Sequence, residues 1–219
     1  MKGTVFSVAL NHRSQLDAWD QAFHQPPYQT PPKTPVWFIK PRNTHLANGG
    51  AIPFPAGETV QSGGTLAVIG KTARNVSREH AMEYVAGYTL CNDYAIRDYL
   101  ENYYRPNLRV KSRDTLTPIG PYIVDRDDVA DPHRLALSTY VNGELRQRGS
   151  TADMIFDIPF LVAYLSEFMT LQPGDMIATG TPKGLADVQP GDEVVVEIEG
   201  IGRLVNHIIS EKDYEESLR

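Results

Sequence analysis

Three short clusters of polar residues have the types and the spacing to do chemistry on a small acid. In the first, residues 92–98, Asp93 follows an apolar run and Arg97 comes four residues later. A carboxylate is a hard oxygen ligand for Mg²⁺ or Mn²⁺, and an arginine can bind a substrate carboxylate through two hydrogen bonds. An ordinary strand-to-helix junction, with the aspartate as cap and the arginine on the surface, would have the same sequence.

The second cluster is residues 111–115 and the third is residues 179–184. Lys111 could stabilise an oxyanion, although three charges in four residues are usually a solvated turn. The third cluster, Thr-Gly-Thr-Pro-Lys-Gly, combines small residues that let a ligand approach the backbone with hydroxyls that can hold a carboxylate. A tight loop without a ligand would look alike, and the glycine spacing is not that of a P-loop.

Several other function classes find no support in the sequence. The six histidines lack paired zinc-ligand spacing, and there is no Gly-x-Ser-x-Gly elbow or dinucleotide fingerprint. The net charge of −6 argues against nucleic acid or anionic membrane as a partner, and no apolar run is long enough to span a bilayer. The single cysteine, Cys91, lies in an apolar run and is expected to be a buried structural thiol, which fits a cytoplasmic protein.

The elements that must position these clusters are mostly strands. Short apolar runs predict strands at residues 4–10, 36–39, 65–69, 85–91, 135–141 and 194–198. An Asn-Gly pair at 142–143 predicts a hairpin, and Pro-Gly-Asp at 173–175 and 190–192 predicts two turns into strands. Apolar residues at helical spacing predict a helix at 159–169, and shorter helices are expected at 14–23 and, after a Ser77 cap, at 78–84.

This pattern predicts a mixed, β-rich α+β fold, rolled or barrel-like, with a few peripheral helices. Five prolines between residues 26 and 35 form a connector that cannot lie inside a helix. We therefore divide the chain into an N-terminal strand–helix and connector segment, residues 1–60, and a larger β domain, residues 61–219.

The three clusters, in this order, resemble the fumarylacetoacetate hydrolase family. The similarity is strong over residues 70–208 and weaker before them, and is carried by Asn92-Asp93 with Arg97-Asp98 and by segments 84–89, 117–121, 141–144, 149–156, 171–175, 179–182 and 199–202. It implies the family's β-roll, with residues 61–219 as the catalytic domain. It also implies a homodimer, or a hetero-oligomer with a paralogous subunit.

The resemblance assigns roles to individual residues. Asp93 is expected to hold a Mg²⁺ or Mn²⁺ ion that the carboxylic acid substrate chelates, and Lys111 and Arg97 are expected to be catalytic. Four further residues are expected to contact the substrate: Thr181, Gly180, Lys40 and Tyr94.

Residues 91–106 and 1–60 resemble the branch of the family that serves 4-hydroxyphenylacetate (homoprotocatechuate) breakdown. That branch implies decarboxylation of 5-oxopent-3-ene-1,2,5-tricarboxylate and isomerisation of 2-hydroxyhepta-2,4-diene-1,7-dioate, with a metal stabilising the dienolate. Two alternatives stay open. One is a hydrolase that cleaves a C–C bond in an acylpyruvate; the other is a weakly active or non-catalytic subunit that pairs with an active paralogue.

Two features depart from the family pattern. The family carries Glu-x-Glu on the strand before a Gly-Lys turn, whereas residues 62–71 contain no carboxylate. The family's N-terminal helix carries a histidine and, three residues later, a glutamate, where this chain has Gln15 and Ala18. We therefore expect weak metal binding, and activity that is weak, metal-independent or dependent on a partner.

Overall fold

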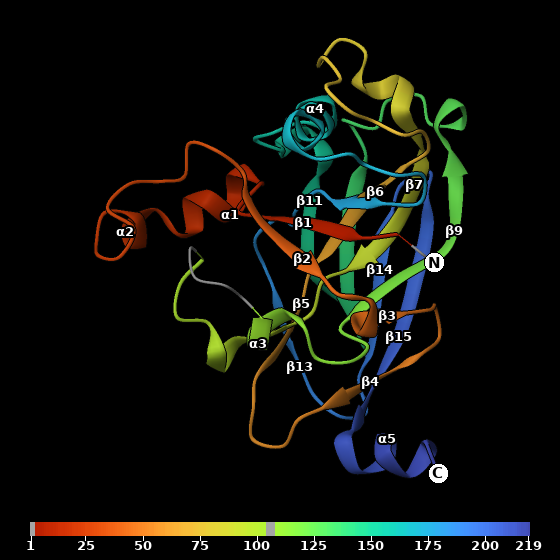
Figure 1. Cartoon of the computed structure of the whole chain (residues 1–219). Helices are drawn as coiled ribbons and strands as arrows, with labels where there is room; N and C mark the ends of the chain where they lie inside the picture. Colours follow the sequence, from red (N-terminus) through yellow and green to blue (C-terminus); the bar gives the residue numbers. More distant parts are fainter. Residues whose placement is uncertain (1–2, 104–107) are drawn as a thin grey trace.

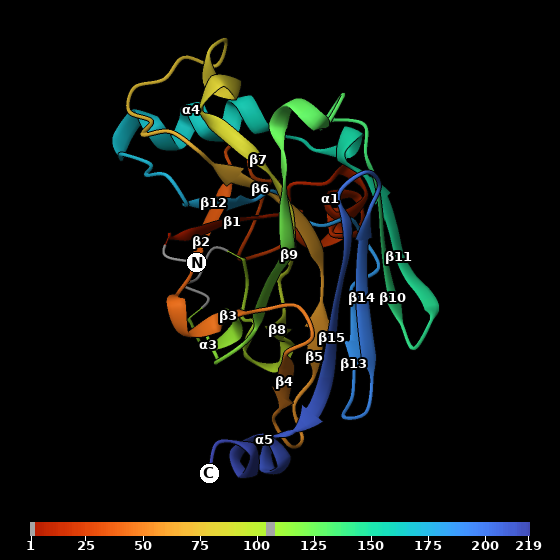
Figure 2. The ribbon, with the colours of Figure 1, turned by 90° about the vertical axis from the view of Figure 1, so that its right-hand side faces the viewer.

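The computed structural model describes residues 3–103 and 108–219, and for residues 64–69 the backbone alone. More of these residues lie in strands than in helices, and the helices lie at the periphery (Figures 1 and 2). The largest sheet has the strand order β2 (Val36–Lys40), β1 (Val5–Ala9), β12 (Met176–Ala178), β6 (Gly64–Ile69), β7 (Val85–Asn92), β9 (Thr117–Asp125) and β3 (His45–Leu46). The prediction of a mixed, β-rich fold with few helices is confirmed.

Two smaller sheets complete the described strands. One has the order β11 (Glu144–Ser150), β10 (Ala136–Val141), β14 (Glu193–Ile198), β15 (Gly202–Ser210) and β4 (Ala51–Phe54). The other has the order β13 (Ala186–Val188), β5 (Val60–Ser62) and β8 (Ala95–Ile96). The strands β14 and β15 contact β7 of the largest sheet, so two sheets enclose the main core.

Helices are short in the described part of the chain. The α-helices are α1 (Arg13–Ala18), α2 (Asp20–Phe23), α3 (Leu108–Lys111), α4 (Ile158–Phe168) and α5 (Glu211–Ser217). Single 3-10 turns are η1 (Arg42–Thr44), η2 (Ala81–Tyr84), η3 (Arg97–Tyr99), η4 (Arg126–Asp128) and η5 (Thr151–Asp153). None of these described helices has the length and apolar character needed to cross a membrane.

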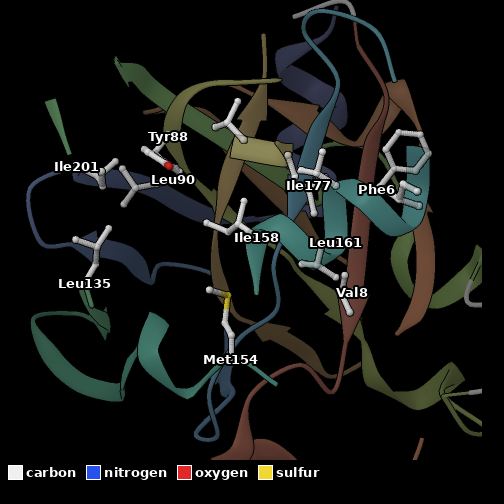
Figure 3. Close-up of a cluster of buried hydrophobic side chains, with 14 of the residues drawn as sticks. Phe6, Val8, Tyr88, Leu90, Leu135, Met154, Ile158, Leu161, Ile177 and Ile201 are labelled. Carbon is white, nitrogen blue, oxygen red and sulfur yellow. The ribbon is translucent and has the colours of Figure 1, made fainter. Parts of the chain in front are cut away.

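The predicted helix at 159–169 is confirmed as α4. Asp157 caps it by accepting a hydrogen bond from the Phe160 amide, at 2.9 Å. Its apolar face enters the main core beside strands β1, β7 and β12 (Figure 3). The core residues labelled there are Phe6, Val8, Tyr88, Leu90, Leu135, Met154, Ile158, Leu161, Ile177 and Ile201.

The predicted hairpin at Asn142-Gly143 is confirmed as the connection between β10 and β11. Both residues have positive φ angles, 52° and 78°, as a two-residue type I′ turn requires. Asparagine and glycine tolerate this conformation better than other residues, which explains why the pair marks the turn in the sequence.

Two predicted helices differ in the structure. The helix expected at 14–23 is divided at Trp19, where φ is −103° and ψ is 2°, and the Trp19 ring packs edge-on against Tyr103 with centroids 4.8 Å apart. The helix expected at 78–84 is wrong: residues 78–80 form a turn and only η2 is helical. A helix of seven residues has little stability of its own, and the amide of Gly70 binds the Tyr84 carbonyl, at 2.8 Å.

The first sixty residues contribute strands to the same sheets as the rest of the chain. Strand β1 pairs in parallel with β12, and β4 pairs in parallel with β15. The proline-rich connector links α2 to β2 and contains no helix or strand. A division at residue 60 therefore remains a prediction about sequence organisation, because the described strands of both segments form joint sheets.

Candidate active site

Strands β7 and β12 and helix α3 bring the three predicted clusters to one pocket. The strands β1, β12 and β7 run in the same direction, because β1 is parallel to β12 and both β12 and β7 are antiparallel to β6. Their carboxyl ends therefore lie at one edge of the sheet. Five of the predicted site residues line the pocket at this edge: Asp93, Arg97, Lys111, Gly180 and Thr181.

Asp93 lies at the inner end of this pocket between two lysines. Its Oδ2 atom accepts a hydrogen bond from Nζ of Lys111 at 2.6 Å, and its Oδ1 atom lies 2.9 Å from Nζ of Lys40. Burial by itself would raise the pKa of Asp93, but the two ammonium groups outweigh it and hold that pKa below its usual value. The carboxylate is therefore ionised and fully engaged by cations.

Strand alternation explains how β2 reaches this site. Phe38 and Lys40 are two residues apart and point to the same face, whereas Trp37 points to the other and stacks on Tyr164 of α4, with centroids 6.3 Å apart. The Lys111 ammonium lies over the Phe38 ring, 5.2 Å from its centroid. One face of β2 thus supplies both a second cation for Asp93 and an aromatic surface for Lys111.

Lys40 is wholly buried and surrounded by oxygen. Besides contacting Asp93, its ammonium donates hydrogen bonds to the carbonyls of Tyr94, at 3.2 Å, and Leu116, at 3.3 Å. Burial lowers the pKa of Lys40, and the Asp93 carboxylate opposes that lowering. Three acceptors around one nitrogen match the three donors of a protonated amine.

Asn92 fixes the backbone beside Asp93. Its side-chain oxygen accepts hydrogen bonds from the Ser62 hydroxyl, at 3.1 Å, and from the Gly63 amide, at 2.9 Å. The Asp93 amide in turn donates to the Gly63 carbonyl, at 2.8 Å. These bonds hold the end of β7 against the end of β5 and the residue that follows it, so that the carboxylate has a defined position.

Thr181 is positioned by a buried polar network. Nε2 of Gln147 donates to Oγ1 of Thr181, at 2.8 Å, and to the Pro182 carbonyl, at 2.6 Å, while the Gln147 oxygen accepts from the Thr139 hydroxyl. A carbonyl only accepts, so the amide nitrogen must face this way. Because Gln147 donates to Thr181, the Thr181 hydroxyl proton is left to donate to a ligand.

The neighbouring position 180 requires a glycine. Its φ angle is +102°, and a Cβ atom there would come within 2.9 Å of the Asn11 Cβ. The side-chain nitrogen of Asn11, Nδ2, donates a hydrogen bond to the Thr179 carbonyl, at 2.7 Å, and so holds this loop against the end of β1. Gly180 is therefore required by the packing of the loop against Asn11, and its contact with a ligand remains a prediction.

The pocket continues outward into a second cavity. Arg97 and Gln15 line both, and Lys183 and Ala18 line the outer one. Gln15 thus lies on the wall of both cavities, and Ala18 lies on the wall of the outer one. Arg97 and Lys183 make the outer end cationic.

Two predicted substrate contacts lie elsewhere. Lys40 lies behind Asp93 and is not on the pocket wall. Its side chain is buried and points toward the carbonyls of Tyr94 and Leu116. Tyr94 is wholly buried among Ile52, Val60 and Ile96, on the core side of the chain. Neither residue lines the pocket. Cys91 is buried, and burial raises the pKa of its thiol to about 12, as a structural cysteine requires.

Sequence reasoning missed Phe38 and Gln147. Phe38 could have been found from the alternation in β2, which places it on the face of Lys40. Gln147 gave no signal, because its partners lie 8 and 34 residues away on other elements.

The residues around Asp93 do not fit a Mg²⁺ or Mn²⁺ ion. Among the described residues no three His, Cys, Asp or Glu side chains come together, and residues 1–2, 64–69 and 104–107 contain none of these types. Such ions prefer several anionic oxygens. Asp93 offers one carboxylate already bound by two ammonium groups, and a divalent ion roughly 4 Å from an ammonium is repelled by about 8 kcal/mol at an effective dielectric constant of about 20.

Comparison with known proteins identifies the family and similar enzymes. The family model for the C-terminal region of fumarylacetoacetate (FAA) hydrolase matches residues 4–209. The chain is 63% identical over 212 residues to a 4-hydroxyphenylacetate degradation bifunctional isomerase/decarboxylase of Salmonella dublin, which covers 96% of this chain and 48% of that protein. The chain thus spans about half the length of this relative.

A bifunctional isomerase/decarboxylase of the same name from Escherichia coli aligns over more residues than this chain has. The alignment is 37% identical over 426 residues and covers 97% of this chain and 99% of the relative. An alignment of that length requires this chain of 219 residues to match two successive segments of the relative. The relative therefore carries two regions that are each similar to this chain.

Solved structures are also similar. The 5-carboxymethyl-2-hydroxymuconate delta-isomerase of Mycobacterium smegmatis is 36% identical with a TM-score of 0.82, over 95% of this chain and 79% of that one. The maleylpyruvate hydrolase of Sphingobium sp. SYK-6, solved with manganese(II) and pyruvate, is 32% identical with a TM-score of 0.78, over 94% of this chain and 70% of that one. By sequence and by fold, the chain belongs to the fumarylacetoacetate hydrolase family.

Proposed function

We propose that this chain decarboxylates and isomerises an unsaturated 2-oxo or 2-hydroxy di- or tricarboxylic acid of homoprotocatechuate catabolism. The observation that carries the proposal is the convergence of Lys111, Thr181 and Arg97 on one pocket. This arrangement offers donors for a carboxylate and a cation for a developing enolate. The substrate class draws on the relatives named as bifunctional isomerase/decarboxylases.

Decarboxylation requires an acceptor for the electron pair of the bond that breaks. When the bond to the departing CO₂ breaks, its electron pair passes through the conjugated double bond to the 2-oxo oxygen and forms a dienolate. Lys111 donates one of its three protons to Asp93, and the others are available to this oxygen. A pre-positioned donor of this kind contributes about 10²–10³ in rate. A proton from solvent water then adds to a carbon of the dienolate, which completes the isomerisation.

The two ends of the pocket suit the two ends of such an acid. The Thr181 hydroxyl donates to the carboxylate beside the 2-oxo group, at the inner end. Arg97 and Lys183 bind the far carboxylate in the outer cavity, where both side chains line the wall. An acid without the far carboxylate should therefore bind more weakly.

The hydrolase alternative is less favoured by the pocket residues. Hydrolysis of a C–C bond requires a base to activate water, and neither Gln15 nor Ala18 can accept a proton at neutral pH. Asp93, held between two ammonium groups, is a poor base. Decarboxylation requires an electron acceptor and no activated water.

We also propose that the chain assembles with a second family domain, either another copy or a paralogous subunit. The doubled match to the Escherichia coli relative supports this, because that protein carries two such regions in one chain. Light scattering of the purified protein should give a mass well above the single-chain 24.4 kDa at micromolar concentration. A mass near 24.4 kDa would exclude self-association and leave the paralogue.

Turnover of 5-oxopent-3-ene-1,2,5-tricarboxylate tests the catalytic proposal. Release of CO₂ and the absorbance of the conjugated product are followed with purified protein, with Mn²⁺ and with a chelator. The proposal predicts turnover that Lys111→Ala reduces. No turnover by the chain alone or with its paralogous subunit would contradict it and favour the non-catalytic subunit.

A further inference from the structure

A buried cation, Lys40, lies behind the inner end of the pocket, where we expected a residue that contacts the substrate. Lys40 is 0% exposed at its side chain and lies against the same carboxylate that Lys111 binds from the pocket side. Two ammonium groups around one carboxylate leave this end with one net positive charge. All three oxygens around the Lys40 ammonium belong to the protein. Lys40 therefore makes its contacts within the protein and is not placed to contact a ligand.

In the part of the chain that the structure describes, no second acid lines the pocket beside this carboxylate. Asp93 is the only acidic residue among those that line the pocket in the described chain. The neighbouring segment, residues 62–69, has no carboxylate in its sequence, and the uncharged side chain of Asn92 accepts hydrogen bonds from its first two residues. Among the residues that the structure describes, Lys40 and Lys111 are the two cations paired with Asp93, and Lys40 is the one that lies behind it.

We propose that the Lys40 ammonium takes the place of a divalent cation in this pocket, which therefore binds the 2-oxo carboxylate of its ligand without metal. Lys40 does not touch the ligand. It neutralises Asp93, so that the charge of Lys111 remains available to an incoming anion. Lys40 is a positioning residue in this scheme, and Lys111 is the group that contacts the ligand. The proposal rests on the proposed substrate class, but it concerns binding and does not require turnover.

Binding of two probes to the wild-type protein tests the proposal directly. Oxalate serves as a stable mimic of a 2-oxo carboxylate and is titrated calorimetrically with EDTA present and with Mn²⁺ present. Free Mn²⁺ is counted separately by electron paramagnetic resonance. The expected result is the same oxalate affinity under both conditions, and Mn²⁺ binding weaker than micromolar. Sub-micromolar Mn²⁺ binding, oxalate binding that requires Mn²⁺, or no oxalate binding at all would each overturn the proposal.

A charge-removing variant tests the role of Lys40. Lys40→Met should weaken oxalate binding in EDTA at least tenfold, because Asp93 then cancels the charge of Lys111. Lys212→Met, at a lysine 81% exposed on α5, is the matched control and should bind as the wild type does. Unchanged affinity in folded Lys40→Met would refute the role; if that variant does not fold, the wild-type titrations still decide. If the protein binds oxalate without metal but shows no turnover, the proposed reaction is refuted and the proposal about Lys40 is not.

Discussion

Replacing Asp93 by asparagine would leave two lysines without their shared counter-charge. The change keeps the size of the side chain and removes the negative charge that faces Lys40 and Lys111. Lys40 then stays buried next to two neutral carbonyls, those of Tyr94 and Leu116. A buried ammonium in that setting is strongly destabilising.

The magnitude follows from how deeply each lysine lies. Breaking a buried ion pair by removing one partner costs about 3–5 kcal/mol. The Lys40 side chain is 0% exposed and the Lys111 side chain 14%, so Lys40 accounts for most of the loss. In a chain of this size 1 kcal/mol shifts the melting temperature by about 2–4 °C, so Asp93→Asn should lower it by roughly 6–20 °C.

Urea unfolding, followed by tryptophan fluorescence and far-ultraviolet circular dichroism, measures this loss. Asp127→Asn, at an aspartate 79% exposed, is the control and should change stability by less than about 0.5 kcal/mol. Adding Lys40→Met to Asp93→Asn removes the unpaired charge, so the double variant should be at least as stable as Asp93→Asn alone. A loss below about 1 kcal/mol in Asp93→Asn would refute the reasoning.

Further predictions concern catalysis, acid stability and the 179–184 loop. Lys111→Ala should lower turnover about 10²–10³-fold, and Lys111→Arg should restore little, as steady-state kinetics on both variants would reveal. Burial lowers the pKa of His12 to about 4, and the unfolded chain with its usual value near 6.5 takes up the proton first. Stability should therefore fall by about 3 kcal/mol as pH decreases from about 6.5 to about 4, and His12→Asn should flatten this slope in urea titrations. Gly180→Ala should cost about 1–3 kcal/mol, because of its positive φ and its contact with Asn11; unchanged thermal melting would contradict that geometry.

The strands could be predicted because their signals are local. Apolar runs at residues 85–91 and 194–198 became β7 and β14, and the asparagine–glycine pair placed the β10–β11 hairpin. The short helices could not be predicted in the same way, because the stability of a helix of a few residues depends on contacts with other segments of the chain. Trp19 divides one such helix by packing against Tyr103, which is 84 positions further along the chain.

The residue types of the site could be predicted from the sequence, but the directions and contacts of its side chains could not. Clusters at Asp93, Lys111 and Thr181 have residue types that suit an acidic ligand, and they lie in one pocket. The directions of Lys40 and Tyr94 depend on which face of a strand or loop meets the core, and a single sequence without strand register does not contain that information. The ion pair between Lys40 and Asp93 was missed for the same reason.

The position of β1 within its sheet has a consequence for how this protein is made. The strand lies between β2 and β12, and the Thr4 amide bonds to the Asp175 carboxylate, 171 residues away in sequence. A ribosome that adds about 5–20 residues each second takes roughly 10–35 s to cover that distance. Until residues 176–178 emerge, the nascent chain exposes Phe6 and Val8 and one unpaired side of an apolar strand. The pocket can form only at the end of that interval, because Gly180 and Thr181 follow β12 in the sequence.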